Sequence, residues 1–386
     1  MEKVFVRLRQ NPHRYDIRIG RDLLKKSGDW AKNCLSPNTT KITIVSNAKV
    51  FGLYGEVVKK SLVKSGFEIS LFLMGDGERY KNFRVFENAL NFFSERKLKR
   101  TDAIIALGGG VVGDLAGFAA AAYLRGIAFL QIPTTLLSMI DSSVGGKTGV
   151  NTSFGKNLIG AFHQPNGVLV DVKTLETLHR RELTAGFCEA VKQGAIADGN
   201  LFHQTAAFLG NYSPARFKIF FADEKFLSEL EKIISEQIAF KARIVMQDEK
   251  ESTERIDAKS RKILNFGHTF AHALEKITDY KRFKHGEAVG YGILFAAQLS
   301  KTLAILDKDT LKLLNDVVHR SGTLPDVSGI GSEEVFEAFA FDKKQVGKSL
   351  QWILLEDIGK PLVREDIPPP IIKKTLEEFL GKTNPL

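Results

Sequence analysis

Residues 103–113 read Ala-Ile-Ile-Ala-Leu-Gly-Gly-Gly-Val-Val-Gly, and small residues follow from Asp114 to Tyr123. The unbroken apolar run predicts a buried strand, and G-x-G-x-x-G ahead of a small-residue stretch predicts a tight turn into a helix. Glycines let a backbone approach a pyrophosphate closely, and a helix N-terminus offers it unpaired N–H donors. The stretch therefore predicts a dinucleotide-binding turn. The alternative is a turn that only packs a helix tightly on a strand.

Similar strand-and-helix units flank this turn on both sides. Strand-like runs lie at 42–45, 68–74, 102–107 and 129–132, and helical stretches end near residues 60 and 96. Strands that alternate with helices form a parallel sheet covered on both faces. We therefore expect a Rossmann-like α/β domain.

The pattern changes in the second half of the chain. Residues 226–247 and 310–319 have helical spacing of apolar side chains, and strand-like runs become rare. Ser252–Ser260 is polar and has no apolar periodicity, which predicts an exposed loop. The expected fold is a parallel-sheet α/β domain over residues 1–178 followed by an all-α domain over residues 179–386.

Length and composition agree with two ordinary globular domains. The chain has 386 residues, 44% of them hydrophobic, which is more than one core usually organises. It has neither a long uncharged apolar run nor an apolar leader, so we expect no membrane association and a cytoplasmic location. The two cysteines, Cys34 and Cys188, are far apart, which argues against a disulfide framework or a thiolate metal cluster.

The net charge of +10 raises the question of nucleic-acid binding. Lysines and arginines are spread along the whole chain, and no basic block with interleaved aromatic residues is present. We therefore expect no nucleic-acid partner. A diffuse positive field equally concentrates a small anionic substrate.

The dinucleotide site that the turn predicts departs from a standard Rossmann domain. The next strand ends in Pro133-Thr134-Thr135 and lacks the acidic residue that usually binds the ribose. Other loops must then hold the cofactor. Asn47 follows the first strand, and the turn Asp76-Gly77-Glu78-Arg79-Tyr80-Lys81 offers carboxylates for ribose hydroxyls and an ammonium for phosphate. The same turn taken alone is an ordinary solvated loop.

Histidines and a carboxylate in three segments predict a metal site. His268 and His272 lie one helical turn apart on the same face, so one can bind a metal while the other contacts a substrate. The glutamate of H-E-x-x-H is absent, which weakens a metalloprotease interpretation. His285 and Glu189 complete a set typical of catalytic zinc with an open coordination position. Any one of these histidines alone is more often a surface or hydrogen-bonded core residue.

Several motifs together resemble the 3-dehydroquinate synthase family, within the sugar-phosphate cyclase superfamily. The resemblance extends from about Asn47 to Lys348, in the order and spacing of the family. Its motifs are Gly-Gly-Gly-Val-Val-Gly-Asp-Leu-Ala-Gly-Phe at 108–118, Pro-Thr-Thr-Leu-Leu at 133–137, Asp-Ser-Ser-Val-Gly-Gly-Lys-Thr at 141–148, Gly-Lys-Asn-Leu-Ile-Gly at 155–160 and Leu-Asn-Phe-Gly-His-Thr at 264–269.

The resemblance implies two cofactors. Zn²⁺, with Co²⁺ as a substitute, would be held by Glu189, His268 and His285. The implied NAD contacts, with those of the glycine turn, are Asn47, Asp76, Gly77, Glu78, Lys81, Gly109, Gly110, Val111, Gly113, Asp114, Thr134, Thr135, Asp141, Ser142, Lys147, Lys156, Thr174 and Thr177.

It also implies a substrate that carries a carboxylate and a phosphate. The carboxylate-side contacts would be Lys147, Arg261 and Asn265. The phosphate-side contacts would be Asn157, His272, Lys348 and, from a second subunit of a homodimer, Arg125. The implied catalytic set is His272, Glu251, Lys147, Lys192, Lys241, Arg261 and Asn265, with His272 and Glu251 as candidates for proton transfer. In the family only a few residues separate the counterparts of Glu251 and Arg261. The longer segment here makes the correspondence of Glu251 with the family's residue less secure than that of Arg261.

The reaction implied is that of a carbon–oxygen lyase of the shikimate pathway to aromatic amino acids. It converts 3-deoxy-D-arabino-heptulosonate 7-phosphate to 3-dehydroquinate and phosphate. Transient oxidation by NAD, phosphate elimination, reduction and intramolecular aldol closure follow one another without net oxidation. The alternatives are a cyclase of the valiolone or deoxy-inosose type, a metal-dependent polyol dehydrogenase, and a binding protein without catalytic activity.

Overall fold

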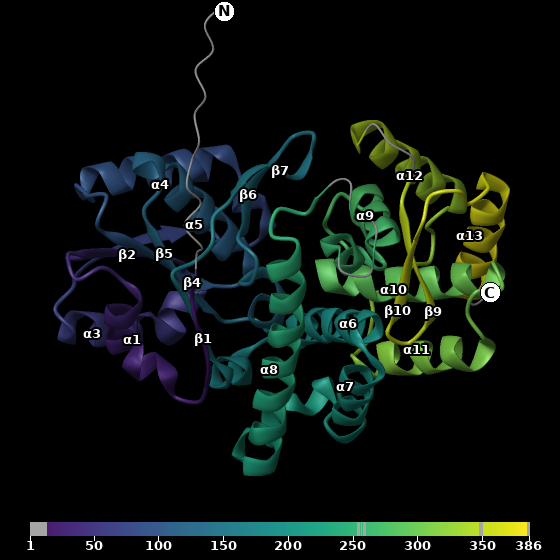
Figure 1. The fold of residues 1–386 in the computed structure, drawn as a ribbon, viewed down its shortest axis with the longest axis horizontal. Coiled ribbons are helices and arrows are strands. Elements are labelled where there is room, and N and C mark those ends of the chain that lie inside the picture. Colours follow the sequence, from purple (N-terminus) through teal and green to yellow (C-terminus); the bar gives the residue numbers. More distant parts are fainter. Residues whose placement is uncertain (1–13, 253–254, 256, 258–259, 347–349, 384–386) are drawn as a thin grey trace, which may run out of the picture.

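The computed structural model describes residues 14–252, 255, 257, 260–346 and 350–383. Its first part is built on a six-stranded sheet with the order β1-β8-β5-β4-β2-β3, and all neighbouring strands are parallel (Figure 1). The strands are β1 (Ile17–Gly20), β2 (Lys41–Asn47), β3 (Glu68–Met74), β4 (Ala103–Gly108), β5 (Ala128–Pro133) and β8 (Gly167–Asp171).

Helices cover both faces of this sheet because side chains alternate along each strand. Ile105 and Leu107 of β4 pack against α1 and α3, whereas Ile104 and Ala106 pack against α4 and α5. The helices are α1 (Ser27–Cys34), α2 (Ala48–Val50), α3 (Glu56–Lys64), α4 (Phe83–Glu95) and α5 (Gly110–Ala122), and shorter helical turns are η1 (Leu23–Lys26), η2 (Phe51–Gly55), η3 (Glu78–Tyr80), η4 (Tyr123–Arg125), η5 (Ser138–Ser142) and η6 (Val172–Thr177).

The predicted Rossmann-like parallel sheet is confirmed. The four strands expected from the sequence are β2, β3, β4 and β5, and each differs from its expected range by at most two residues at either end. The edge strand β1, with only Ile17 and Ile19 as large apolar residues, and its neighbour β8, with the short apolar run Val168–Val170, are not predicted from the sequence. Helix α5 begins at Gly110, inside the glycine motif, so the helix N-terminus lies at the turn itself.

The chain reverses its direction of travel across the sheet at β2. From β2 it moves outward to β3, and it then returns to place β4 on the other side of β2. The carboxyl ends of β2 and β4 therefore lead into loops that diverge, which opens a crevice at that edge. Asn47 and Gly108 end these two strands, so the predicted cofactor motifs lie at the crevice.

A two-stranded antiparallel hairpin, β6 (Lys147–Thr152) and β7 (Gly155–Phe162), leaves the sheet on the side of the helical part (Figure 1). Its two strands approach closely at Gly160, where an added Cβ would lie 1.9 Å from the Thr148 carbonyl oxygen. The Asn151 N–H donates to the Lys81 carbonyl oxygen at 2.8 Å, which ties the hairpin to the predicted cofactor turn.

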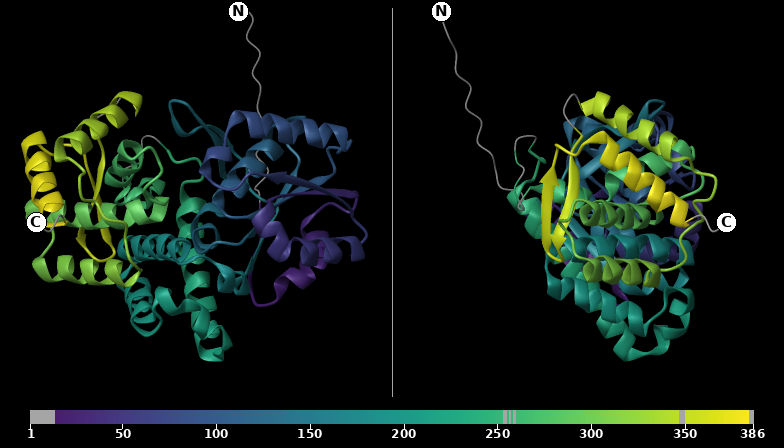
Figure 2. Two further views of the ribbon diagram at one scale, coloured as in Figure 1. Left: turned by 180° about the vertical axis from the view of Figure 1, so that it is seen from behind. Right: turned by 90° about the vertical axis from the view of Figure 1, so that its right-hand side faces the viewer.

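The second part is rich in helices (Figure 2). Its buried apolar side chains form one large core with those of the sheet edge. Helix α10 lies at its centre, nearly all of its residues are buried, and it packs against α6, α9 and α11. The helices are α6 (Arg180–Ala197), α7 (Gly199–Asn211), η7 (Pro214–Ala222), α8 (Glu224–Gln247), η8 (Arg261–Asn265), α9 (His268–Ile277), α10 (His285–Thr302), α11 (Lys308–Arg320), α12 (Ser332–Val346) and α13 (Pro369–Thr383). Among the described helices, none combines the length and apolar composition needed to cross a bilayer.

The helical character of this part is confirmed, and it also contains a hairpin that the sequence does not predict. Strands β9 (Trp352–Asp357) and β10 (Lys360–Arg364) are antiparallel, and β9 packs on α10 (Figure 2, right). The buried run Trp352–Leu355 is apolar on both faces, so periodicity alone does not separate it from a buried helix. Gly359, with φ of 80°, makes the connecting turn.

The polar segment Ser252–Ser260 is described at four positions. Ser252, Arg255, Asp257 and Ser260 belong to no helix or strand, and Ser252 and Asp257 are exposed as predicted. The prediction of exposure is wrong at Ser260, which is fully buried. Its hydroxyl accepts a hydrogen bond from the Lys262 N–H and so caps η8.

Candidate active site

A cavity of about 1220 Å³ lies between the carboxyl edge of the sheet and the helical part. Pockets that hold one drug-sized ligand measure about 300–1,000 Å³, so this cavity has room for more than one small molecule. Most predicted site residues line it. They are Asn47, Asp76, Gly77, Glu78, Lys81, Gly109, Gly110, Val111, Asp114, Thr134, Thr135, Asp141, Ser142, Lys147, Lys156, Asn157, Thr174 and Thr177 from the first part, and Lys192, Lys241, Arg261, Asn265, His268, His272 and His285 from the second.

Among the predicted residues that the structure describes, four do not line the cavity. Gly113 faces the sheet, where an added Cβ would lie 2.9 Å from Gln131 Oε1, so it permits close helix packing. Glu189 lies fully buried behind the two histidines of the wall, and Arg125 is exposed. Glu251 ion-pairs with Lys147, and its Oε1 accepts from Asn265 Nδ2 at 3.3 Å, so it adjoins the cavity despite the longer segment that follows it. Lys348 lies outside the described residues.

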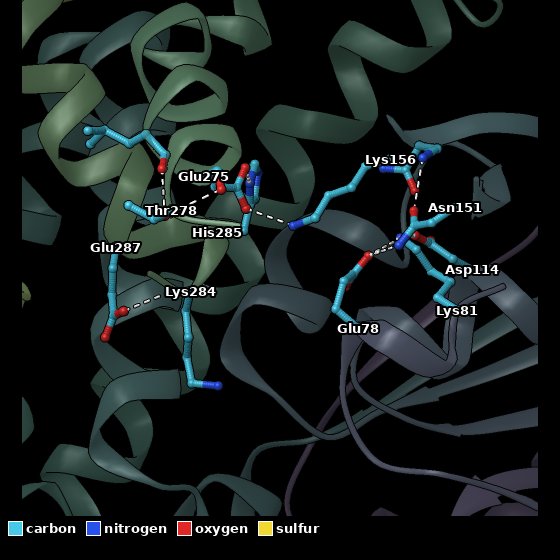
Figure 3. Close-up of polar contacts among 12 residues, drawn as sticks. Glu78, Lys81, Asp114, Asn151, Lys156, Glu275, Thr278, Lys284, His285 and Glu287 are labelled. Carbon is cyan, nitrogen blue, oxygen red and sulfur yellow. Dashed lines mark hydrogen bonds and ion pairs between the residues drawn. The ribbon is translucent and has the colours of Figure 1, made fainter. Parts of the chain in front are cut away.

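On the sheet side of the cavity, Lys81 lies between two carboxylates. Its Nζ is 2.8 Å from Asp114 Oδ2 and 3.2 Å from Glu78 Oε1 (Figure 3). Burial would lower the pKa of Lys81, but the two carboxylates outweigh it and raise this pKa to about 12. Burial would raise the pKa of Glu78, but Lys81 and Lys156 outweigh it and lower this pKa. This acidic and basic cluster is held rigidly at the mouth of the crevice.

The glycine turn leaves little room for side chains. A Cβ added to Gly109 would lie 3.0 Å from Thr135 Cγ2, and one added to Gly110 would lie 3.0 Å from Ser142 Oγ. The N-terminus of α5 therefore faces the cavity without intervening side chains. The geometry agrees with the close backbone approach that an anionic group at a helix N-terminus requires.

On the helical side, the predicted metal ligands come together. Glu189 Oε1 lies 3.6 Å from His285 Nε2 and 4.0 Å from His268 Nε2. The three residues each offer one donor atom, and these three atoms all lie within 4.8 Å of one another. Ligands bound tetrahedrally to Zn²⁺ at about 2.0–2.1 Å lie roughly 3.4 Å from one another, so a small contraction would complete the set.

The chemistry of these three residues fits a divalent cation. Glu189 is fully buried, and neither of its carboxylate oxygens accepts a hydrogen bond from a described residue, although Lys192 Nζ lies 2.6 Å from Oε2. Burial lowers the pKa of His268 well below its usual value, and Lys192 and His285 lower it further. His268 is therefore neutral near pH 7 and offers a lone pair. A buried carboxylate with unsatisfied oxygens beside neutral imidazole is a typical zinc environment.

Cationic side chains gather deeper in the cavity. Lys241 Nζ lies 2.5 Å from Asp141 Oδ1, and burial lowers the pKa of Lys241 although Asp141 partly offsets this. Arg261 Nη1 donates to the carbonyl oxygens of Gly145 at 3.0 Å and Glu249 at 2.7 Å. These contacts fix the guanidinium with further N–H donors available, since arginine carries five.

Asp248 closes the polar segment onto this arginine. Its Oδ1 accepts from the Ser252 N–H at 2.7 Å and its Oδ2 accepts from the Arg261 N–H at 2.9 Å. Burial would raise the pKa of Asp248, but these backbone N–H donors outweigh it and lower this pKa. Asp248 thereby holds Ser252 and Arg261, which lie at the two ends of the longer segment, close together. This keeps Arg261 at the cavity.

Two interactions next to the predicted ligands were missed from the sequence. Glu275, three residues after His272 on the same face of α9, accepts from Lys156 and lies beside His285. Its spacing of seven residues from His268 is the signal that could have revealed it. Glu287 is fully buried and pairs with the Arg181 guanidinium through two hydrogen bonds of 2.5 and 2.7 Å, which fixes the start of α10.

Comparison with known proteins identifies the family. The model of the 3-dehydroquinate synthase N-terminal domain matches residues 71–185, and that of the C-terminal domain matches residues 186–345. The chain is 39% identical to 3-dehydroquinate synthase of Streptococcus thermophilus strain CNRZ 1066, over 98% of this chain and 100% of the relative. It is 42% identical to 3-dehydroquinate synthase of Campylobacter jejuni subsp. doylei, over 88% of this chain and 93% of the relative.

A solved structure supports the fold. The 2-epi-5-epi-valiolone synthase ValA from Streptomyces hygroscopicus subsp. jinggangensis 5008, with NAD⁺ and Zn²⁺ bound, superposes with a TM-score of 0.85 at 23% identity, over 98% of this chain and 100% of that chain. The two family models cover more than half of the chain, and the sequence relatives extend along nearly all of it. The chain is therefore a member of the 3-dehydroquinate synthase family.

Proposed function

We propose that this chain converts 3-deoxy-D-arabino-heptulosonate 7-phosphate to 3-dehydroquinate and phosphate, as a lyase of aromatic amino acid biosynthesis. The observation that carries the proposal is one cavity with two chemically different walls. One wall is the glycine turn at the sheet edge, and the other holds His268 and His285 in front of Glu189. A redox cofactor and a Lewis acid can thus act on one substrate.

We assign the metal to Glu189, His268 and His285, and NAD to the crevice at the ends of β2 and β4. When bound, Zn²⁺ or Co²⁺ would polarise substrate hydroxyl oxygens, and NAD would take up and return a hydride. The unsatisfied oxygens of Glu189 support the first assignment. The open approach at Gly109 and Gly110 supports the second.

The substrate carboxylate would bind beside Arg261, Asn265 and Lys147. Arg261 presents a planar fork whose position is fixed by two carbonyl oxygens, and such a fork suits a planar carboxylate. The Arg261 fork therefore favours a carboxylated substrate over the valiolone-type alternative. Asn157, His272 and Lys348, with Arg125 from a second subunit, would take the phosphate.

Proton transfer would fall to His272 and Glu251. His272 lies on the cavity wall one helical turn from His268, with the centres of the two rings 5.4 Å apart. Burial would raise the pKa of Glu251, but Lys147 outweighs it and lowers this pKa, so Glu251 is ionised near pH 7. An ionised carboxylate can accept a proton, whereas the neighbouring lysine can orient it.

The proposal is tested by incubating the zinc-loaded chain with the heptulosonate phosphate and catalytic amounts of NAD⁺. We expect phosphate release in a 1:1 ratio with 3-dehydroquinate, identified by mass spectrometry and by absorbance, and no net NADH. Net formation of NADH would instead identify a polyol dehydrogenase.

Two controls sharpen this assay. A heptulose phosphate that lacks the carboxylate should be turned over at least about 100-fold less efficiently, because the desolvated Arg261 fork would lose its partner. Efficient conversion of that compound to a cyclitol would contradict the proposal and favour the valiolone-type alternative. Omission of NAD⁺ from cofactor-stripped chain should abolish phosphate release.

We further propose that residues 1–178 form the NAD-binding domain and residues 179–386 the metal- and substrate-binding domain. The sheet strands all precede α6, and the two family models meet close to this point, which supports the division. We also propose a cytoplasmic homodimer. The free thiols of Cys34 and Cys188 suit a reducing compartment, and exposed Ile159 and Phe154 on the β6–β7 hairpin offer apolar surface to a second copy.

A further inference from the structure

Glu275 is a buried carboxylate between the two walls of the cavity. Its side chain is 1% exposed, and it lies on α9, seven residues after His268. Its Oε1 accepts from Lys156 Nζ of β7 at 2.9 Å, and its Oε2 is 3.2 Å from His285 Nδ1 at the start of α10 (Figure 3). One side chain thus joins β7 to the consecutive helices α9 and α10, more than 100 residues further along the chain.

The contact to His285 determines which of its nitrogens faces Glu189. A carboxylate oxygen accepts hydrogen bonds, so the 3.2 Å contact of Glu275 Oε2 with Nδ1 places an N–H at that nitrogen. Nδ1 of His285 must therefore carry the proton. The other nitrogen, Nε2, lies 3.6 Å from Glu189 Oε1 and faces the proposed metal position.

Another role for this carboxylate has to be weighed. His272, Glu275 and His285 also bring donor atoms within 4.8 Å of one another, as a second cation site would. However, the Lys156 ammonium already contacts Glu275 Oε1 at 2.9 Å, and its side chain is only 25% exposed. The other oxygen of Glu275, Oε2, is taken up by His285 Nδ1, whereas at Glu189 the Lys192 ammonium contacts only Oε2 and Oε1 faces the two imidazoles without a hydrogen bond from a described residue. Lys156 also lies 4.4 Å from the centre of the Tyr280 ring, which holds it in place.

We infer that Glu275 is a positioning residue. Its Oε2 orients His285 for the metal through Nδ1, and its Oε1 holds Lys156 of the β6–β7 hairpin. This inference rests on the proposed function, because it assumes a metal at Glu189, His268 and His285. Carboxylates that hold the outer nitrogen of a ligating histidine typically change metal affinity about 10–100-fold when removed. Lys156 contacts Oε1 and thereby leaves Oε2 for the histidine.

The test compares zinc affinity of the wild-type chain with that of Glu275→Gln and Glu275→Asp, by competition with a chromophoric chelator. We expect about 10–100-fold weaker binding for Glu275→Gln and partial recovery for Glu275→Asp, which keeps the charge. The visible spectrum of bound Co²⁺ should shift for Glu275→Gln. Asp102→Asn is the matched control. Asp102 is equally buried and accepts three backbone hydrogen bonds at the amino end of β4, so this variant should lose stability but keep its zinc affinity.

The outcomes distinguish a failure of the inference about Glu275 from a failure of the proposed function. Zinc affinity and a Co²⁺ spectrum of Glu275→Gln equal to those of wild type would overturn the inference, as would two zinc ions bound per chain. A wild-type chain that binds no zinc would overturn the proposed function itself. If the variants do not fold, ¹⁵N-histidine spectra of the zinc-loaded wild type decide, with His285 assigned from its loss in His285→Gln. A protonated Nδ1 and ligating Nε2 are expected, and ligation through Nδ1 would refute the role of Glu275.

Discussion

At the scale of single residues, protonation states are set before any ligand arrives. His268 is neutral because burial and adjacent positive charge disfavour its imidazolium form. Glu189 stays fully buried, with Lys192 as its charged neighbour. Burial would lower the pKa of His285, but Glu275 and Glu189 outweigh it and raise this pKa, so a metal competes with a proton at His285 and not at His268.

The variant His268→Asn tests this set. It should lose zinc on dialysis and lower kcat/KM at least about 100-fold, because one of three proposed ligands is removed. Thermal unfolding should separate the cause from misfolding: zinc should raise the Tm of wild type but not that of the variant. His203→Asn, which changes an exposed histidine of α7, is the control and should behave as wild type. A variant that still gained Tm with zinc would count against His268 as a ligand.

The Asp248 carboxylate stabilises the polar segment between Ser252 and Arg261. The pKa of Asp248 is lowered in the folded chain, so the ionised form is favoured by folding. Its contribution is therefore complete above the unfolded pKa of about 4 and is lost as the pH falls through the lower folded value.

For Asp248→Asn we expect the free energy of unfolding at pH 6 to fall by about 1–2 kcal/mol. Asparagine has one side-chain oxygen, so one charge-assisted hydrogen bond becomes neutral and the other is lost, because an amide NH2 cannot accept from a backbone N–H. Urea titrations between pH 6 and pH 2 measure this. The difference from wild type should shrink below about pH 4. A difference that stayed constant with pH would mean that the Asp248 charge is not the source of the stabilisation.

At the scale of elements, the free space in front of the N-terminus of α5 is needed for the proposed NAD site. Gly109 has an extended backbone that any residue can adopt, so the fold does not require glycine there. The requirement comes from the space in front of the helix, where Thr135 and Ser142 already stand close.

Gly109→Val should therefore separate binding from stability. We expect NAD⁺ affinity, measured by calorimetry, to fall roughly tenfold or more, since the added methyl groups occupy the approach to the helix N-terminus. The Tm should change by only a few degrees. Gly52→Ala, at a position with no neighbouring atom within 4 Å of the added Cβ, is the control. Unchanged NAD⁺ affinity in Gly109→Val would move the cofactor away from this turn.

At the scale of the whole molecule, the exposed position of Arg125 bears on assembly. Leu124 and Arg125 both have positive φ, of 50° and 66°, in the turn that follows α5. Arg125 is exposed and does not line the cavity of its own chain. Such a side chain can take part in the reaction only if a second copy brings it to a site.

Mixed dimers test this arrangement. Arg125→Ala and Glu189→Ala chains should each be nearly inactive alone, whereas refolding them together in equal amounts should restore up to about a quarter of wild-type activity, because a heterodimer holds one intact site. Sedimentation should give twice the chain mass of 42.9 kDa. If the mixture stays inactive while heterodimers form, Arg125 acts within its own chain or not at all.

The sequence alone determined the features that depend on local spacing. The parallel sheet follows from strand-like apolar runs that alternate with helical stretches, and the turn at Gly108–Gly113 follows from its glycines. The interval of four residues places His268 and His272 on one face of α9. Only the tertiary structure decided which distant groups meet: Lys241 with Asp141, Glu251 with Lys147 and Glu275 with His285. Periodicity records which face of an element is buried, whereas the partner across that face depends on how elements far apart in the chain pack together.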